Sequence, residues 1–149
     1  MAQAQAAATP ATQAIKFELV SPEEKLVSEP VWHAVIPGED GELGIGPDHT
    51  ALVVALKPGV VRLYREKGGE PWKIFITGGF ADITGKNCTV LAEDAFEVSG
   101  FVQADLEQEL RNYNEDFARA EDAVAKARAT RRIAMTKAKI QAITGRIVF

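Results

Sequence analysis

The chain has 149 residues, of which 46% are hydrophobic, and its formal net charge is −4. This composition excludes a disordered protein, and the negative charge gives no general attraction to nucleic acid. The single cysteine, Cys88, excludes an internal disulfide, and the lack of eighteen consecutive apolar residues excludes a membrane-spanning helix.

Residues 1–14 are predicted to form a disordered tail. They read MAQAQAAATPATQA, without a charged residue. A secretory signal needs a basic start and an apolar run, and a transit peptide needs arginines. Neither kind of leader is therefore expected here.

Residues 15–99 are predicted to form a β-domain of many short strands. Turn residues such as Pro37-Gly38 and Pro58-Gly59 recur at intervals of about eight to twelve positions, a spacing typical of a sandwich or barrel. The segments 66–70 and 84–87 are predicted hairpin turns, because their glycines can adopt positive φ. The β-rich runs are FELV, VWHAVI, ALVVAL, VVRLY, WKIFIT, FADI and CTVLA.

The segment PGEDGELGIGPDHTAL, residues 37–52, is predicted to be a rigid polar loop. It contains no lysine and lacks the third glycine of a dinucleotide-binding loop, and its acids do not keep the spacing of a calcium loop. Its glycines permit tight turns and its prolines stiffen both ends. Glu42, Asp48 and His49 are then polar groups on a fixed platform. A solvated loop without a partner fits the residues equally well.

Neither a metal site nor a catalytic motif is predicted. His33 and His49 are the only histidines, so zinc would lack ligands. His33 lies in a strand-like run, which favours a structural role. Signatures of nucleophilic catalysis are missing, and a small hydrolase that uses unmarked carboxylates stays open only as an alternative.

Residues 100–149 are predicted to form an antiparallel two-helix hairpin. Residues 101–144 contain no glycine or proline and are rich in helix-forming residues. Residues 103–122 hold seven acids, whereas residues 123–146 hold seven basic residues and no acid. A turn near Arg119–Asp122 would place these two arms side by side and pair their charges. One apolar stripe at helical spacing consists of Leu106, Leu110, Tyr113 and Phe117.

Residues 15–98 resemble the epsilon subunit of the F-type ATP synthase, whose mitochondrial counterpart is called delta. The resemblance is carried by PGEDGELGIGPDHTAL, then LKPGVV, FITGGFADI and CTVLAEDA. It implies a ten-stranded β-sandwich followed by a two-helix antiparallel hairpin. It also implies a non-catalytic rotor subunit of the central stalk, which couples proton flow to ATP synthesis.

The resemblance implies three partners: the gamma subunit, the c-ring of the membrane sector, and the alpha–beta hexamer. In this family the positions that match Glu42 and His49 face the c-ring, and Asp48 lies beside them in the sequence. Membrane association then occurs only through the complex. The expected place is the cytoplasmic face of the bacterial inner membrane, with the matrix face of the mitochondrial inner membrane as the alternative.

In many relatives the helical hairpin inhibits ATP hydrolysis, when basic residues of its second helix meet an acidic loop of beta. Arg128, Arg131 and Arg132 fit this role in charge, and a solvated basic face is the alternative. Some bacterial relatives bind ATP at the first helix. The residues that follow Asp105 lack the arginine and alanine of that motif, and Asp116 and Arg119 match it only about ten residues late. No cofactor is therefore expected.

A free-standing β-sandwich with a basic helical arm is the alternative function. Seven basic residues in the last arm motivate it. That arm lacks the aromatic residues on which bases would stack, so nucleic acid is not an expected partner.

Overall fold

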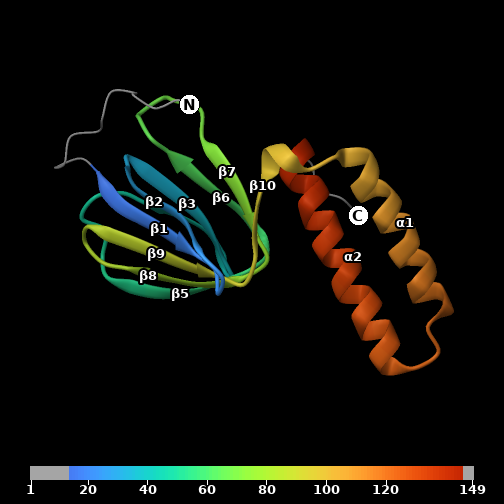
Figure 1. Cartoon of the computed structure of the whole chain (residues 1–149). Coiled ribbons are helices and arrows are strands. Elements are labelled where there is room, and N and C mark those ends of the chain that lie inside the picture. Colours follow the sequence, from blue (N-terminus) through green and yellow to red (C-terminus); the bar gives the residue numbers. More distant parts are fainter. Residues whose placement is uncertain (1–13, 146–149) are drawn as a thin grey trace. The chain divides into compact units, whose positions relative to one another are not determined.

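The computed structural model describes residues 14–145 (Figure 1). The predicted disordered tail lies outside these residues, apart from Ala14. The chain divides into two compact units between Phe96 and Glu97, which we call the sheet unit and the helical unit. The sheet unit contains ten strands, and the helical unit contains two long α-helices after a 3₁₀ turn. The predicted fold class is thus confirmed.

The sheet unit is a β-sandwich made from one continuous sheet with the order β10-β7-β6-β3-β5-β8-β9-β1-β2, in which β4 also pairs with β3. The two layers are joined where Gly38 of β3 pairs with Leu56 of β5. The strands are β1 (Ile15–Val20), β2 (Lys25–Val31), β3 (His33–Gly38), β4 (Gly41–Ile45), β5 (Leu52–Leu56), β6 (Gly59–Tyr64), β7 (Trp72–Ile76), β8 (Gly79–Ile83), β9 (Asn87–Ala92) and β10 (Ala95–Glu97).

Alternate residues of these strands point inward and form one hydrophobic core. On β1, Phe17 and Leu19 are fully buried, whereas the residue between them, Glu18, is partly exposed. This period of two is the pattern of a half-buried strand. The core therefore fixes which face of each strand is left for partners. Its largest members are Phe17, Ile15, Leu19, Ile36, Ile45, Leu63, Ile76 and Ile83.

The two predicted hairpin turns are confirmed. Between β8 and β9, the amide of Thr84 donates to the carbonyl of Asn87 at 2.8 Å. Between β6 and β7, Gly68 adopts a φ of 79°, which an L side chain rarely adopts. Gly79, the first residue of β8, must be a glycine because a Cβ there would collide with the carbonyl oxygen of Leu91.

The prediction that residues 37–52 form a loop is wrong in the middle of the segment. Gly41–Ile45 is strand β4, which pairs antiparallel with β3 in the register Pro37↔Glu42 and Ala34↔Ile45. Ile45 is fully buried in the core, so this strand is anchored. Glycine-rich sequence disfavours a strand locally, but pairing and burial override that preference.

The helical unit is the predicted hairpin. Its helices are α1 (Gln103–Arg119) and α2 (Ala123–Thr144), preceded by the 3₁₀ helix η2 (Val98–Gly100). α1 continues unbroken through Asn112 and Asn114, and the turn lies within the predicted segment 119–122. Within residues 14–145, neither helix carries an apolar stretch long enough to cross a bilayer.

The apolar stripe joins the two arms unevenly. Leu106 is buried, Leu110 and Tyr113 are half-buried, and Phe117 near the turn is 42% exposed. Two cations of α2 lie over aromatic rings of α1: Arg132 over Tyr113 at 5.6 Å, and Lys126 over Phe117 at 5.8 Å.

Among the described residues, no acid of α1 forms an ion pair with Lys126, Arg128, Arg131, Arg132 or Lys137 of α2, so the predicted pairing of the arms by charge is not found at these positions. The ion pairs in the sheet unit include Lys25 with Glu18, Arg62 with Glu42 and Arg65 with Glu29. The acids of α1 are exposed, and Asp116 lines a cleft with Arg128 and Arg132 of α2 without an ion pair to either. Apolar and cation–π contacts therefore join the arms.

Candidate functional site

Glu42, the first predicted contact residue, lies near the start of β4 and is held by an arginine. Nη1 of Arg62 donates to Oε2 of Glu42 at 3.0 Å, and Nη2 donates to Oε1 at 3.2 Å. Both side chains are partly exposed. Sequence reasoning missed Arg62, which lies twenty positions away on β6 and is brought to Glu42 by the sheet.

The next outward position of β4 is Gly44, which is exposed and lies beside the ring of His33. A Cβ at Gly44 would lie 2.9 Å from Nε2 of His33. The His33 ring is half-buried and lies near the rings of Trp32 and Tyr64, with centroid distances of 5.4 and 6.2 Å. Burial lowers the pKa of His33, so its ring favours the neutral form. His33 thus packs against β4, as expected for a structural histidine.

Asp48 and His49, the other predicted contact residues, follow the end of β4. Asp48 adopts a φ of 63°, and its amide donates to the carbonyl of Gly85 at 2.6 Å. Aspartate tolerates this left-handed conformation better than most residues do. Nδ1 of His49 lies 2.9 Å from the carbonyl oxygen of Thr50. A carbonyl only accepts, so Nδ1 carries the proton and Nε2 is the acceptor in the neutral ring.

The predicted contact residues therefore form two groups. Glu42 lies beside the β3–β4 turn, whereas Asp48 and His49 lie beyond the opposite end of β4, against the β8–β9 turn. Six residues of extended chain span at most about 20 Å. A single docking partner would have to be broad enough to reach both groups.

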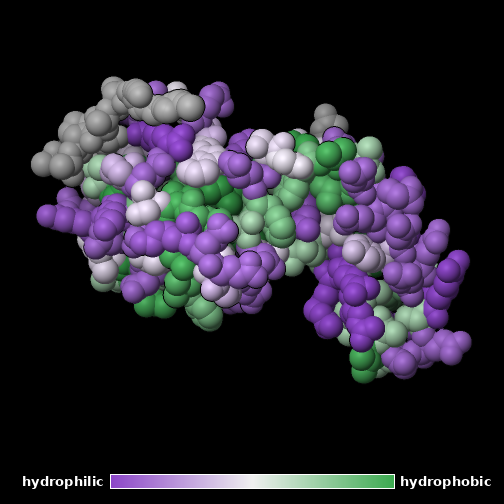
Figure 2. All heavy atoms as spheres, viewed as in Figure 1, coloured by the Kyte–Doolittle hydropathy of each residue, from purple (hydrophilic) through white to green (hydrophobic). Residues whose placement is uncertain are grey.

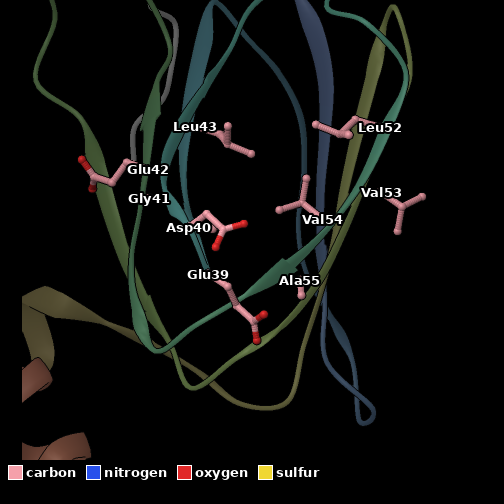
Figure 3. Close-up of a pocket in the computed structure, with 10 residues that line it drawn as sticks. Glu39, Asp40, Gly41, Glu42, Leu43, Leu52, Val53, Val54 and Ala55 are labelled. Atoms are coloured by element: carbon pink, nitrogen blue, oxygen red, sulfur yellow. The ribbon is translucent and has the colours of Figure 1, made fainter.

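A cleft of about 380 Å³ opens between β4 and β5. Figure 3 shows Asp40, Leu43 and Val54 pointing into it, while the Glu42 side chain points away. The cleft combines acidic groups from the β3–β4 turn with an apolar wall from β5. Glu39 and Asp40 were not predicted as site residues, although they lie next to Glu42 in the sequence.

The outer face of the layer β5-β8-β9-β1 carries a row of apolar side chains, which we call the apolar row. Phe80 pairs with Ala55 on one side and with Leu91 on the other, and Leu91 pairs with Val20. Phe80 is 57% exposed and Leu91 is 52% exposed. Figure 2 shows apolar residues gathered at the lower edge of the sheet unit, over β5 and β8. Sequence reasoning missed this row, although strand alternation already placed Phe80 and Leu91 opposite to the core.

The helical unit places two of the three predicted arginines in one cleft of about 250 Å³. Arg128 and Arg132 of α2 line it together with Asp116 and Arg119 of α1. Arg131 does not line this cleft, and all three predicted arginines are exposed. In the part of the chain that the structure describes, no three His, Cys, Asp or Glu side chains gather to hold a metal ion.

The sequence of the sheet unit matches one family model. Residues 14–98 match the model described as ATP synthase, Delta/Epsilon chain, beta-sandwich domain. The chain is similar to an ATP synthase epsilon chain of Rhodospirillum centenum, with 38% identity over 87% of this chain and 91% of the relative. An ATP synthase epsilon chain of Mesorhizobium japonicum is 44% identical over 78% of this chain and 86% of the relative.

Solved structures agree on the fold. A chain in the Euglena gracilis mitochondrial ATP synthase (OSCP/F1/c-ring) superposes with a TM-score of 0.75 at 21% identity, covering 83% of this chain and 78% of that one. A chain in the Tetrahymena thermophila mitochondrial ATP synthase, central stalk/c-ring, gives a TM-score of 0.60 at 16% identity, covering 89% and 98%.

Proposed function

Because the chain belongs to the delta/epsilon family of ATP synthase subunits, we propose that it is a non-catalytic rotor subunit of the central stalk. It links the gamma subunit to the c-ring and passes the rotation driven by proton flow to the alpha–beta hexamer. It associates with the membrane only through the complex, on the cytoplasmic face of the bacterial inner membrane. The bacterial names of its relatives support this location over the mitochondrial matrix.

The apolar row is the observation that carries this proposal. Phe80 and Leu91 are large, more than half exposed and fixed in register on a rigid sheet. Contiguous exposed apolar side chains on a soluble domain mark a surface that a partner covers. We assign the apolar row to the gamma subunit, since a tight permanent interface needs an apolar centre.

The β4 platform is assigned to the c-ring. Glu42 at one end, and Asp48 and His49 at the other, present polar groups on backbone fixed by the β3–β4 pairing and by the hydrogen bond to Gly85. Such groups can form a polar rim contact with the loops of a membrane rotor without entering the bilayer.

The helical unit is assigned a regulatory role. Arg128, Arg131 and Arg132 are exposed cations on α2, and the structure records no carboxylate paired with them among the described residues. They are therefore available to an acidic loop of the beta subunit. Binding there would restrain rotation and inhibit ATP hydrolysis.

Charge placed in the apolar row tests the proposal. We expect Phe80→Lys and Leu91→Lys to weaken assembly with gamma by on the order of tenfold or more, because each buries an unpaired cation at the centre of the interface. Thr89→Lys is the matched control, since Thr89 lies on the same face two positions before Leu91. Binding to isolated gamma is the measurement, with thermal melting to verify the fold. Equal binding by all three variants would refute the assignment.

The assignment of the β4 platform to the c-ring is tested by how tightly proton pumping is coupled to ATP hydrolysis. We expect Glu42→Lys, or His49→Trp, to lower ATP-driven proton pumping relative to ATP hydrolysis in vesicles that contain the reconstituted synthase. The melting temperature should stay close to that of the wild type, since both side chains lie outside the core. Unchanged coupling with normal melting would remove the c-ring contact from the proposal.

A further inference from the structure

We propose that Arg62 is a positioning residue for docking: it holds the Glu42 carboxylate in the orientation in which the partner receives it. This inference rests on the proposed contact between Glu42 and the c-ring, and it adds a residue from a different strand to that contact. Arg62 itself acts through Glu42 and need not touch the partner.

The sheet brings the two side chains to one face. Arg62 on β6 pairs with Val35 on β3, and Val35 pairs with Gly44 on β4. Directly paired residues share a face, and Glu42 lies two positions from Gly44, so Arg62 and Glu42 both point outward. Arg62 spans β3 diagonally to reach the carboxylate.

The contact has the geometry that fixes a carboxylate. Two separate N–H groups of Arg62 donate to the two oxygens of Glu42, at 3.0 and 3.2 Å. A planar guanidinium bound in this way restrains both the position and the plane of the carboxylate. A free glutamate at the edge of a turn would instead sample many rotamers and would lose that freedom on docking.

The pair also defines what the partner must offer. Each carboxylate oxygen accepts one hydrogen bond from Arg62 and keeps acceptor capacity for another. The positive charge of Arg62 already offsets the negative charge of Glu42. A single cation on the partner would therefore gain little free energy by binding to this carboxylate. The geometry therefore favours neutral donors, such as backbone amides or side-chain amides of a polar loop.

Arg62 is linked to β4 mainly through Glu42. The hydrogen bond to Glu42 is the largest cause that raises the pKa of Arg62, whereas burial lowers it. Tyr64 lies two positions after Arg62 on the same face of β6, and its ring lies near that of His33, which is next to Gly44 of β4. These contacts connect the Glu42–Arg62 pair to the packing of β3 and β4.

A second surface pair provides a matched control. Arg65 donates to both oxygens of Glu29, with its Nε at 2.6 Å and its Nη2 at 3.3 Å. This pair is also exposed and two-pronged, but it involves none of the proposed contact residues. Arg65→Gln removes a comparable arginine–carboxylate pair, together with the contact of Arg65 over the Trp72 ring at 4.7 Å, without touching Glu42.

The experiment is a double-mutant cycle in the reconstituted synthase. The variants are Glu42→Gln, Arg62→Gln and the double variant, with Arg62→Lys and Arg65→Gln beside them. Proton pumping per ATP hydrolysed is measured in vesicles, and melting of each subunit verifies its fold. We expect both single variants to lower coupling by a similar factor, on the order of twofold to tenfold, and the double variant to fall no further. Arg62→Lys should recover part of the loss, and Arg65→Gln should resemble the wild type.

The outcomes separate the two claims. The positioning role of Arg62 is overturned if Glu42→Gln lowers coupling while Arg62→Gln does not. It is also overturned if the double variant loses coupling by the product of the two single factors. In both cases the docking role of Glu42 stands. If Glu42→Gln has no effect, the docking role fails and the inference fails with it. An equal loss in Arg65→Gln would also overturn the inference, because any broken surface pair would then produce the effect.

Discussion

Gly44 provides the space that the His33 ring occupies. A Cβ at this position would lie 2.9 Å from Nε2 of His33, closer than real side chains approach one another. We expect Gly44→Ala to lower the free energy of unfolding by about 1 kcal/mol, the lower end of the cost of overpacking, because Gly44 is exposed and the clash is with the end of a side chain. Urea denaturation of the whole chain measures this change.

Gly46 is the matched control for this substitution. A Cβ at Gly46 would lie 3.6 Å from Nδ1 of the same ring, an ordinary contact distance. Gly46→Ala should therefore cost less than Gly44→Ala, and His33→Ala should recover part of the stability lost in Gly44→Ala. Equal costs at both glycines would show that the His33 ring moves freely.

Cys88 on β9 is a buried thiol without a reactive role. Burial raises its pKa to about 12, and the nearby Asp82 carboxylate acts in the same direction. The thiolate is the reactive form, so the native protein should resist thiol reagents at pH 8 and react fully in denaturant. A colorimetric thiol titration with and without guanidinium decides this. Rapid modification of the native protein would contradict the burial.

The same thiol predicts a dependence of stability on pH. The ordinary pKa of a cysteine thiol is 9.0, so the unfolded chain loses this proton at a lower pH than the folded chain does. Above that pH the folded chain binds more protons than the unfolded chain. The contribution of Cys88 to the free energy of unfolding is therefore fully present below about pH 9 and is lost toward pH 12. The stability difference between the wild type and Cys88→Val should therefore shift against the wild type over this range, and a constant difference would contradict the raised pKa.

At the scale of elements, α2 begins at a side-chain cap. Oδ1 of Asp122 accepts from the amide of Ala125 at 2.7 Å, and Gly145 ends the helix with a φ of 72°. We expect Asp122→Ala to destabilise the hairpin by ~0.5–2 kcal/mol, and Asp122→Asn to preserve most of the cap. Hydrogen exchange at Ala125 and Lys126 reports the loss locally. Identical exchange in both variants would show that the cap contributes nothing.

The two-helix hairpin was predicted correctly, but one of the reasons given for it, the pairing of acidic and basic arms, does not hold in the structure. The separation of acidic and basic residues suggested arms paired by charge. In the structure the arms meet through Leu106 and the cation–π contacts of Lys126 and Arg132. Because exposed ion pairs contribute only ~0.2–1 kcal/mol each, burial of the stripe decides the pairing.

At the scale of the whole molecule, each unit carries its own candidate surface. The sheet unit offers the apolar row on one outer face and the β4 platform along another strand. The helical unit offers exposed arginines around a cleft at its turn. The apolar row has the apolar centre that a permanent interface needs, whereas the other two surfaces present polar and charged groups.

The sequence by itself determined the division into a β-domain and a helical hairpin, the hairpin turns and the family. These follow from local periodicity, from glycine positions and from the pattern over residues 15–98, which need no knowledge of distant contacts. It could not predict β4, because only the pairing with β3 and the burial of Ile45 make a strand of a glycine-rich segment. Nor could it find the partner of Glu42, or show that the outward residues Phe80 and Leu91 pair with each other. Those depend on register across strands, which the tertiary structure alone decides because one face must bury the shared core.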